Sequence, residues 1–114
     1  MVKPLQGDVY WVAFGVSGDY GPSGKRPAVI IQNDLLNRSN IRTTVVTLLT
    51  SNTKLSKVPG NVSLDKGAAN LPKSSVVVVS QIATVDKNRL IEKIGTLERD
   101  KIEEILSGCQ MVIR

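Results

Sequence analysis

Three short polar segments of this chain combine residue types that could bind or cleave an anionic substrate, and each is expected at the end of a strand. The first is Lys25-Arg26-Pro27. The proline biases Arg26 towards an extended backbone, which would project its guanidinium at the mouth of a strand. A guanidinium offers a fork of donors that fits phosphoryl oxygens, whereas a lysine ammonium does not. The ordinary interpretation is a solvated Lys–Arg pair.

The other two segments carry hydroxyl and amide groups. Thr50-Ser51-Asn52 ends a β-branched run, and a threonine hydroxyl there could donate a hydrogen bond to a substrate. Residues of this kind more often bond their own backbone in a turn. Ser80-Gln81 interrupts an apolar run, where a buried glutamine with satisfied hydrogen bonds is the ordinary explanation.

The composition excludes much of the usual chemistry of enzymes. The 114 residues include no histidine and one cysteine, Cys109. Ser-His-Asp and Cys-His triads are therefore impossible, as is a zinc site of the usual kind. A lone cysteine cannot form an internal disulfide, which fits a reducing compartment. We expect a protein that needs no metal and no cofactor.

Charge and hydropathy indicate the kind of partner and the cellular compartment. The net charge of +5 favours an anionic partner. The first residues lack the apolar region of a signal peptide, and no apolar run is long enough to cross a membrane. The sequence therefore predicts a cytoplasmic protein, with residues 1–114 forming a single domain.

The pattern of apolar and β-branched residues predicts a mainly β fold. Glycine, serine and proline mark residues 15–26 as a loop. Asn33-Asp34 predicts the start of a short helical turn through Leu35 and Leu36. Residues 8–14 are apolar on both faces, which suggests a strand buried on both sides. The valine run 75–79 predicts a central strand with both faces covered. Residues 82–85 are predicted to continue this strand after a kink. The predicted strands are 8–14, 27–32, 43–50, 61–64, 75–79, 82–85 and 90–94.

The C-terminal residues change to a helical period. One apolar stripe is formed by Ile102, Ile105, Leu106, Cys109, Val112 and Ile113. Thr96 is a candidate N-cap, and Cys109 lies on the stripe, which makes it a core residue rather than a nucleophile. The predicted architecture is α+β: a strongly bent antiparallel sheet or small SH3-like barrel with a C-terminal helix packed on it.

Four segments in this order resemble the MazF/PemK-type toxins, the endoribonucleases of bacterial toxin–antitoxin pairs. Each motif is weak alone, but their order and spacing together are specific, and they cover nearly the whole chain. The segments are Gly7-Asp8-Val9-Tyr10, residues 25–34 with Asn37-Arg38, Thr50-Ser51, and residues 75–90 with Ser80-Gln81-Ile82. Two departures stand out: residues 18–24 replace the family's Gly-Ser-Glu-Gln loop, and Ala83 replaces an arginine. Both put cleavage specificity in question more than catalysis.

The resemblance implies a homodimer that cleaves single-stranded RNA across its interface and is inhibited by an acidic antitoxin. It assigns catalysis to Arg26 and Thr50. It assigns RNA binding to Gln81, Lys25, Ser51, Ser80 and Tyr20.

Cleavage by the RNA's own 2′-hydroxyl, without histidine or metal, must depend on charge stabilisation. Arg26 would hold the phosphoryl oxygens while Thr50 donates a further hydrogen bond. The resemblance implies that this arginine also serves as acid and base. A guanidinium with a pKa above ~12 is a poor general base. A strongly perturbed environment and a water relay both stay open as routes for the proton.

Two other functions compete with this interpretation. The related CcdB toxins share the barrel but poison DNA gyrase without catalysis, and only Arg26 and Thr50 argue against that role. The second rival is a nucleic-acid-binding module without activity. The aromatic content of 4% weakens it, because sequence-tolerant binding of single strands relies on stacking.

Overall fold

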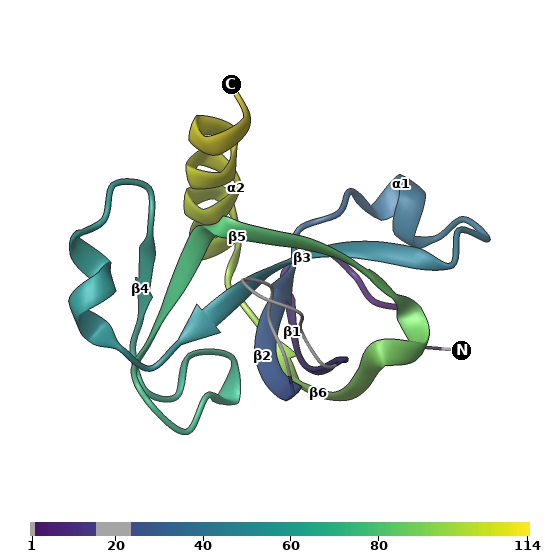
Figure 1. Ribbon diagram of the computed structural model, residues 1–114, viewed down its shortest axis with the longest axis horizontal. Helices are drawn as coiled ribbons and strands as arrows, with labels where there is room; N and C mark the ends of the chain where they lie inside the picture. Colours follow the sequence, from purple (N-terminus) through teal and green to yellow (C-terminus); the bar gives the residue numbers. More distant parts are fainter. Residues whose placement is uncertain (1, 16–23) are drawn as a thin grey trace.

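The computed structural model describes residues 2–15 and 24–114, and its strands form one antiparallel sheet in the order β4-β5-β3-β2-β1-β6 (Figure 1). The sheet curls into a half-barrel, and the C-terminal helix stands on it. The strands are β1 (Asp8–Phe14), β2 (Gly24–Ile30), β3 (Thr43–Thr50), β4 (Val62–Leu64), β5 (Ser75–Asp86) and β6 (Leu90–Thr96). The helices are α1 (Asp34–Asn37) and α2 (Arg99–Ile113), with 3-10 turns at Thr53–Lys57, Ala68–Asn70 and Lys87–Arg89. The predicted fold class is confirmed.

The second strand differs from its predicted range of 27–32. β2 begins at Gly24 because its first residues pair with β1, from Phe14 opposite Gly24 to Val12 opposite Arg26. The expected loop over 15–26 is therefore wrong for its last three residues. β2 also ends earlier, at Ile30, because Gln32 leaves the ladder and turns its amide into a buried network. Pairing with a partner strand overrode the local signals of glycine and proline.

The predicted kink after the valine run is a bulge within one long strand. β3 pairs Thr47 with Ile82 but its next residue, Leu48, with Val78, which leaves three residues of β5 unmatched. The Thr47 hydroxyl donates to the Val78 carbonyl at 2.6 Å. Bulges bend a strand and increase its twist. This one lies where β5 crosses from the helix side to the curl of the sheet in Figure 1.

The sheet is covered on both faces by separate cores, so the expectation of a strand buried on both sides is confirmed for β1. Val9 lies in the core beneath α2, whereas Tyr10 and Val12 lie in the core inside the curl. All five residues of the valine run 75–79 are buried, as expected. Cys109 is also a core residue, and burial raises the pKa of its thiol.

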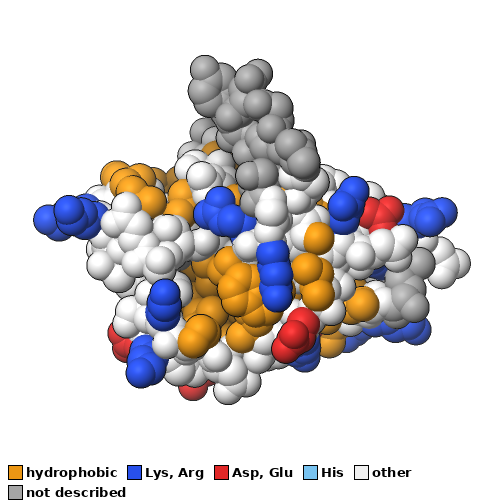
Figure 2. Space-filling view, turned by 60° about the horizontal axis from the view of Figure 1, so that its bottom comes forward, with side chains coloured by type: hydrophobic (Ala, Val, Ile, Leu, Met, Phe, Trp, Pro, Cys, Tyr) orange, Lys and Arg blue, Asp and Glu red, His pale blue; other side chains and the backbone are white. Residues whose placement is uncertain are grey.

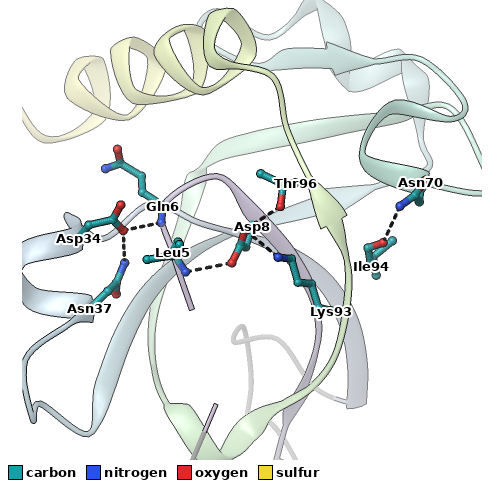
Figure 3. A network of polar contacts seen from close by, with 9 residues as sticks. All are labelled: Leu5, Gln6, Asp8, Asp34, Asn37, Asn70, Lys93, Ile94 and Thr96. Atoms are coloured by element: carbon teal, nitrogen blue, oxygen red, sulfur yellow. Dashed lines mark hydrogen bonds and ion pairs between the residues drawn. The ribbon is translucent and has the colours of Figure 1, made fainter. Parts of the chain in front are cut away.

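The start of α2 corrects the expected cap. Thr96 is the last residue of β6, and the helix begins at Arg99 with Glu98 before it. The Thr96 hydroxyl instead donates to Asp8 Oδ1 at 2.8 Å, while Asp8 Oδ2 accepts from the Leu5 amide at 3.0 Å (Figure 3). Asp8 is buried, so these donors stabilise its charge and join the N-terminal segment to β6.

Only the first part of the predicted helical stripe is buried. Ile102, Ile105 and Cys109 pack in the core, but Val112 and Ile113 are 45% and 76% exposed. The helix extends beyond the sheet at its C-terminal end (Figure 1), so the described residues leave its last turn largely uncovered. Neither helix in the described ranges is long and apolar enough to span a membrane.

A buried polar network surrounds Asn37, which is 2% exposed. Its amide donates to the Gln32 carbonyl at 2.8 Å and to Asp34 Oδ1 at 3.1 Å (Figure 3 draws the second bond). Its Oδ1 accepts from Gln32 Nε2 and from the Thr44 hydroxyl, both at 2.9 Å. Its backbone carbonyl accepts from Lys87 Nζ at 3.0 Å, and that lysine is 3% exposed. The network therefore connects α1 to β3 and to the end of β5.

Candidate active site

A half-open hollow of about 300 Å³ lies where β2 and β3 separate. The two strands pair only over residues 28–30 of β2. Beyond the pair Ala28–Leu48, β2 continues along β1 and β3 continues along β5. Residues Leu71, Pro72, Lys73 and Ser75, from the segment that leads into β5, line another side of the gap. Its lining consists of Trp11, Lys25, Arg26, Pro27, Leu49, Thr50, Ser51, Leu71, Pro72, Lys73 and Ser75.

The register explains why Arg26 and Thr50 line the same hollow. Ala28 is opposite Leu48, so two steps back along β2 and two steps forward along β3 lead to Arg26 and Thr50. Each is the residue at which its strand has left the other. The sequence predicted a site containing both, and the structure places them on opposite walls of one hollow, 24 positions apart in the chain.

The hollow is cationic. Its described lining contains Lys25, Arg26 and Lys73 and no aspartate or glutamate. The three ion pairs found among the described residues, Lys93–Asp8, Arg99–Glu103 and Lys101–Glu104, all lie elsewhere. On the face shown in Figure 2, hydrophobic side chains gather in the centre and most charged side chains around them are lysine or arginine. Such a surface attracts an anionic, partly apolar ligand such as a nucleic acid.

Lys25 and Thr50 keep donors available for such a ligand. Lys25 Nζ lies 4.9 Å from the centroid of the Trp11 ring, a cation–π contact that steadies an otherwise exposed side chain. The Thr50 hydroxyl accepts a hydrogen bond from the Asn52 amide at 3.2 Å. This confirms that the Thr50 oxygen bonds the local backbone in a turn, as is ordinary for such residues. Within residues 2–15 and 24–114 that hydroxyl donates to no protein group, so its proton can serve a substrate.

The other predicted RNA-binding residues divide into three cases. Lys25 and Ser51 line the hollow. Ser80 and Gln81 lie in the bulge of β5, both exposed and outside the lining, so the buried-glutamine interpretation is wrong. Tyr20 lies outside the described residues.

Trp11 and the lining residues of segment 71–75 belong to the site but were not predicted from the sequence. In the sequence, Trp11 is indistinguishable from the other apolar residues of β1, and Lys73 from a solvated lysine of a loop. Neither residue has a local signal, because both reach the hollow through the way the strands and the loop pack.

The comparison with known families identifies the chain. Residues 5–113 match the family described as PemK-like, MazF-like toxin of type II toxin-antitoxin system. The chain belongs to this family. The resemblance predicted from its four motifs is thereby confirmed.

Individual relatives agree with this assignment. Endoribonuclease MazF6 of Mycobacterium tuberculosis is 34% identical over 106 residues, which cover 93% of each chain. Endoribonuclease MazF of Staphylococcus saprophyticus is 38% identical over 100 residues, covering 88% of this chain and 82% of the relative. Among solved structures, a MazE–MazF crystal structure from Deinococcus radiodurans shares the fold with a TM-score of 0.75. Its sequence is 20% identical, and the match covers 99% of this chain and 97% of that one.

Proposed function

We propose that this chain is the toxin of a type II toxin–antitoxin system and acts as an endoribonuclease on single-stranded RNA. The observation that carries the proposal is the pairing of Arg26 and Thr50 across a cationic hollow whose described lining has no acidic residue. The names of its relatives, endoribonucleases of the same family, support the class of reaction.

In the proposed reaction the RNA supplies its own nucleophile. The 2′-hydroxyl loses its proton and its oxygen bonds to the adjacent phosphorus, while the bond from phosphorus to the 5′-oxygen breaks and that oxygen gains a proton. The products carry a 2′,3′-cyclic phosphate and a 5′-hydroxyl. Negative charge grows on the phosphoryl oxygens in the transition state, and fixed donors aimed at that charge accelerate the step.

Arg26 and Thr50 supply those donors. Arg26 is a partly buried residue of β2 that lines the hollow, and the fork of its guanidinium can bond two phosphoryl oxygens. Thr50 donates its hydroxyl proton from the opposite wall, and the sheet holds both groups in place. The hollow's described donors are ammonium, guanidinium and hydroxyl groups, which bind phosphate directly and are poor metal ligands. The proposed reaction therefore needs no divalent ion.

The proposed partners are a second copy of the chain and an acidic antitoxin. The exposed apolar last turn of α2, where Met111 and Ile113 are 62% and 76% exposed, would be covered in a homodimer. A cationic hollow suits an acidic, partly disordered segment that folds on binding. A solved MazE–MazF pair of the same fold supports such a partner. The reaction would take place in the cytoplasm, where the substrate RNA is found.

Incubation of the purified protein with a long RNA tests this function. We expect cleavage in EDTA at a restricted set of sequences, with 5′-hydroxyl ends and cyclic phosphate or its hydrolysed form. A 2′-deoxy sugar at a mapped cut should stop cleavage there. Loss of activity in EDTA, or 5′-phosphate ends, would overturn the mechanism. No RNA cleavage, with gyrase-dependent DNA breakage instead, would select the CcdB-like function.

A further inference from the structure

We propose that Lys73 is a substrate-positioning residue that binds an RNA phosphate next to the one held by Arg26. The inference rests on the proposed function. Lys73 lines the hollow from the loop between β4 and β5, whereas Arg26 and Thr50 line it from the strands. RNA carries one phosphate per nucleotide, so a cation on a separate wall of the same hollow suits a flanking phosphate rather than the reacting one.

The backbone at Lys73 is held on both sides. Leu71 is 4% exposed and belongs to the core beneath α2. The Gly67 amide donates to the Leu71 carbonyl at 2.8 Å, which closes the loop. On the other side, the buried Ser75 hydroxyl donates to the Lys73 carbonyl at 3.0 Å. An exposed lysine side chain therefore extends from a fixed point at the edge of the hollow.

The same loop stores strain, which indicates that surrounding contacts impose its shape. Ala69 and Asn70 have φ of 48° and 62°, a left-handed conformation that is unfavourable for residues other than glycine. The Asn70 amide donates to the Ile94 carbonyl of β6 at 3.1 Å (Figure 3). Gly95 lies so close that a Cβ there would collide with the Ala69 carbonyl. β6 thus fixes the loop through Ile94 and Gly95, two residues that do not line the hollow.

Lys73 has no carboxylate partner among the described residues, and this leaves its charge available. It lies in the same lining as Lys25 and Arg26, so three like charges face one small space. Their mutual repulsion is relieved when a polyanion binds. Because a flanking phosphate keeps its charge through the reaction, Lys73 would bind the ground state and the transition state equally. Its loss should raise KM and leave kcat nearly unchanged.

The test compares Lys73→Gln with Lys66→Gln, a lysine that is exposed in the same loop but outside the hollow. One phosphate contact to a single strand contributes about 0.7 to the slope of log affinity against log salt. We therefore expect Lys73→Gln to raise KM about fivefold near 0.1 M salt and to reduce that slope by about 0.7, with kcat within about twofold. Lys66→Gln should change neither. Equal effects of the two variants, or a fall in kcat alone, would overturn the proposal.

A second variant tests the positioning by the loop. Asn70→Ala removes the bond to Ile94 without touching the hollow, and it should raise KM in the wild-type background but not in Lys73→Gln. Additive effects would show that the loop does not act through Lys73. Binding of RNA made non-cleavable by 2′-deoxy or 2′-O-methyl sugars gives a readout independent of catalysis. If the wild type cleaves no RNA, the proposed function fails, while the salt slope of binding still decides the role of Lys73.

Discussion

The hollow and the network around Asn37 both contain polar side chains, but they differ in whether those groups have hydrogen-bond or ion-pair partners within the protein. In the network, each amide oxygen and nitrogen of Asn37 has a partner at 2.8–3.1 Å. In the hollow, the described residues present three cations and a threonine hydroxyl with no carboxylate among them. A satisfied cluster stabilises the fold, whereas unpaired donors gathered on a surface are available to a ligand.

This difference separates structure from function more clearly than residue type does. Both Lys87 and Lys73 lie close to an end of β5, Lys87 in the 3-10 turn after it and Lys73 in the loop before it. Lys87 is 3% exposed and donates to the carbonyl of Asn37, so it serves the fold. Lys73 is exposed at the edge of the hollow and has no such bond in the described part of the chain, so it can serve a substrate. We therefore expect substitutions in the hollow to change activity and substitutions in the network to change stability.

The largest effect is expected from Arg26→Lys. It keeps the charge but removes the fork, and loss of such a transition-state donor should lower kcat by about 1,000-fold. The melting temperature should stay within a degree or two, since Arg26 makes no ion pair within residues 2–15 and 24–114. Cleavage kinetics and thermal unfolding on the same preparation check both parts. Full activity in this variant would remove Arg26 from catalysis.

Asn37→Ala should lower the stability of the protein and leave its activity unchanged. The change leaves buried partners such as the Thr44 hydroxyl and Gln32 amide without Asn37, and should cost about 3 kcal/mol of unfolding free energy. Because Asn37 does not line the hollow, activity per folded molecule should be unchanged well below the transition. Denaturant unfolding and active-site titration separate the two quantities. A large loss of kcat at full folding would contradict the distinction between the regions.

Thr50→Ala should slow cleavage by about 100-fold, as loss of one donor to a charged transition state does. Thr50→Ser keeps the hydroxyl and should retain a measurable part of the rate. The comparison uses single-turnover rates, with circular dichroism as the folding control. Equal loss in both variants would mean that the methyl group, through packing, is what matters.

The smallest effect concerns Tyr10, which lies in the core inside the curl and belongs to neither polar region. Burial, and secondarily the charge of Asp8, raises the pKa of Tyr10 above its ordinary 10.0. The folded state therefore holds this proton more tightly, and stability should decline as pH rises above about 10. Tyr10→Phe should show a shallower decline between pH 9 and 11 in thermal unfolding. An identical pH dependence in both proteins would exclude Tyr10 as its source.

The sequence predicted elements best where one local pattern decided the outcome. β1 and β3 begin and end at the predicted residues, because each is a β-branched or apolar run bounded by breakers. The prediction of element boundaries failed where contact with a residue or strand remote in the sequence set the boundary. β2 starts at Gly24 because β1 pairs with it. Thr96 belongs to β6, where it pairs with Asp8 and its hydroxyl donates a hydrogen bond to the Asp8 carboxylate. No local pattern contains that information.

For the site, the sequence by itself determined which residue types could act: one arginine before a proline, a threonine at a strand end, and no histidine. Motif order was enough to indicate the family. Only the tertiary structure decided that these groups share a hollow, because this depends on where β2 and β3 stop pairing. It alone added Trp11 and Lys73, since one comes from a neighbouring strand and the other from a loop fixed by Leu71, Ser75 and β6. A chain sets its chemistry residue by residue, but distances between remote residues are set by packing, which no short segment encodes.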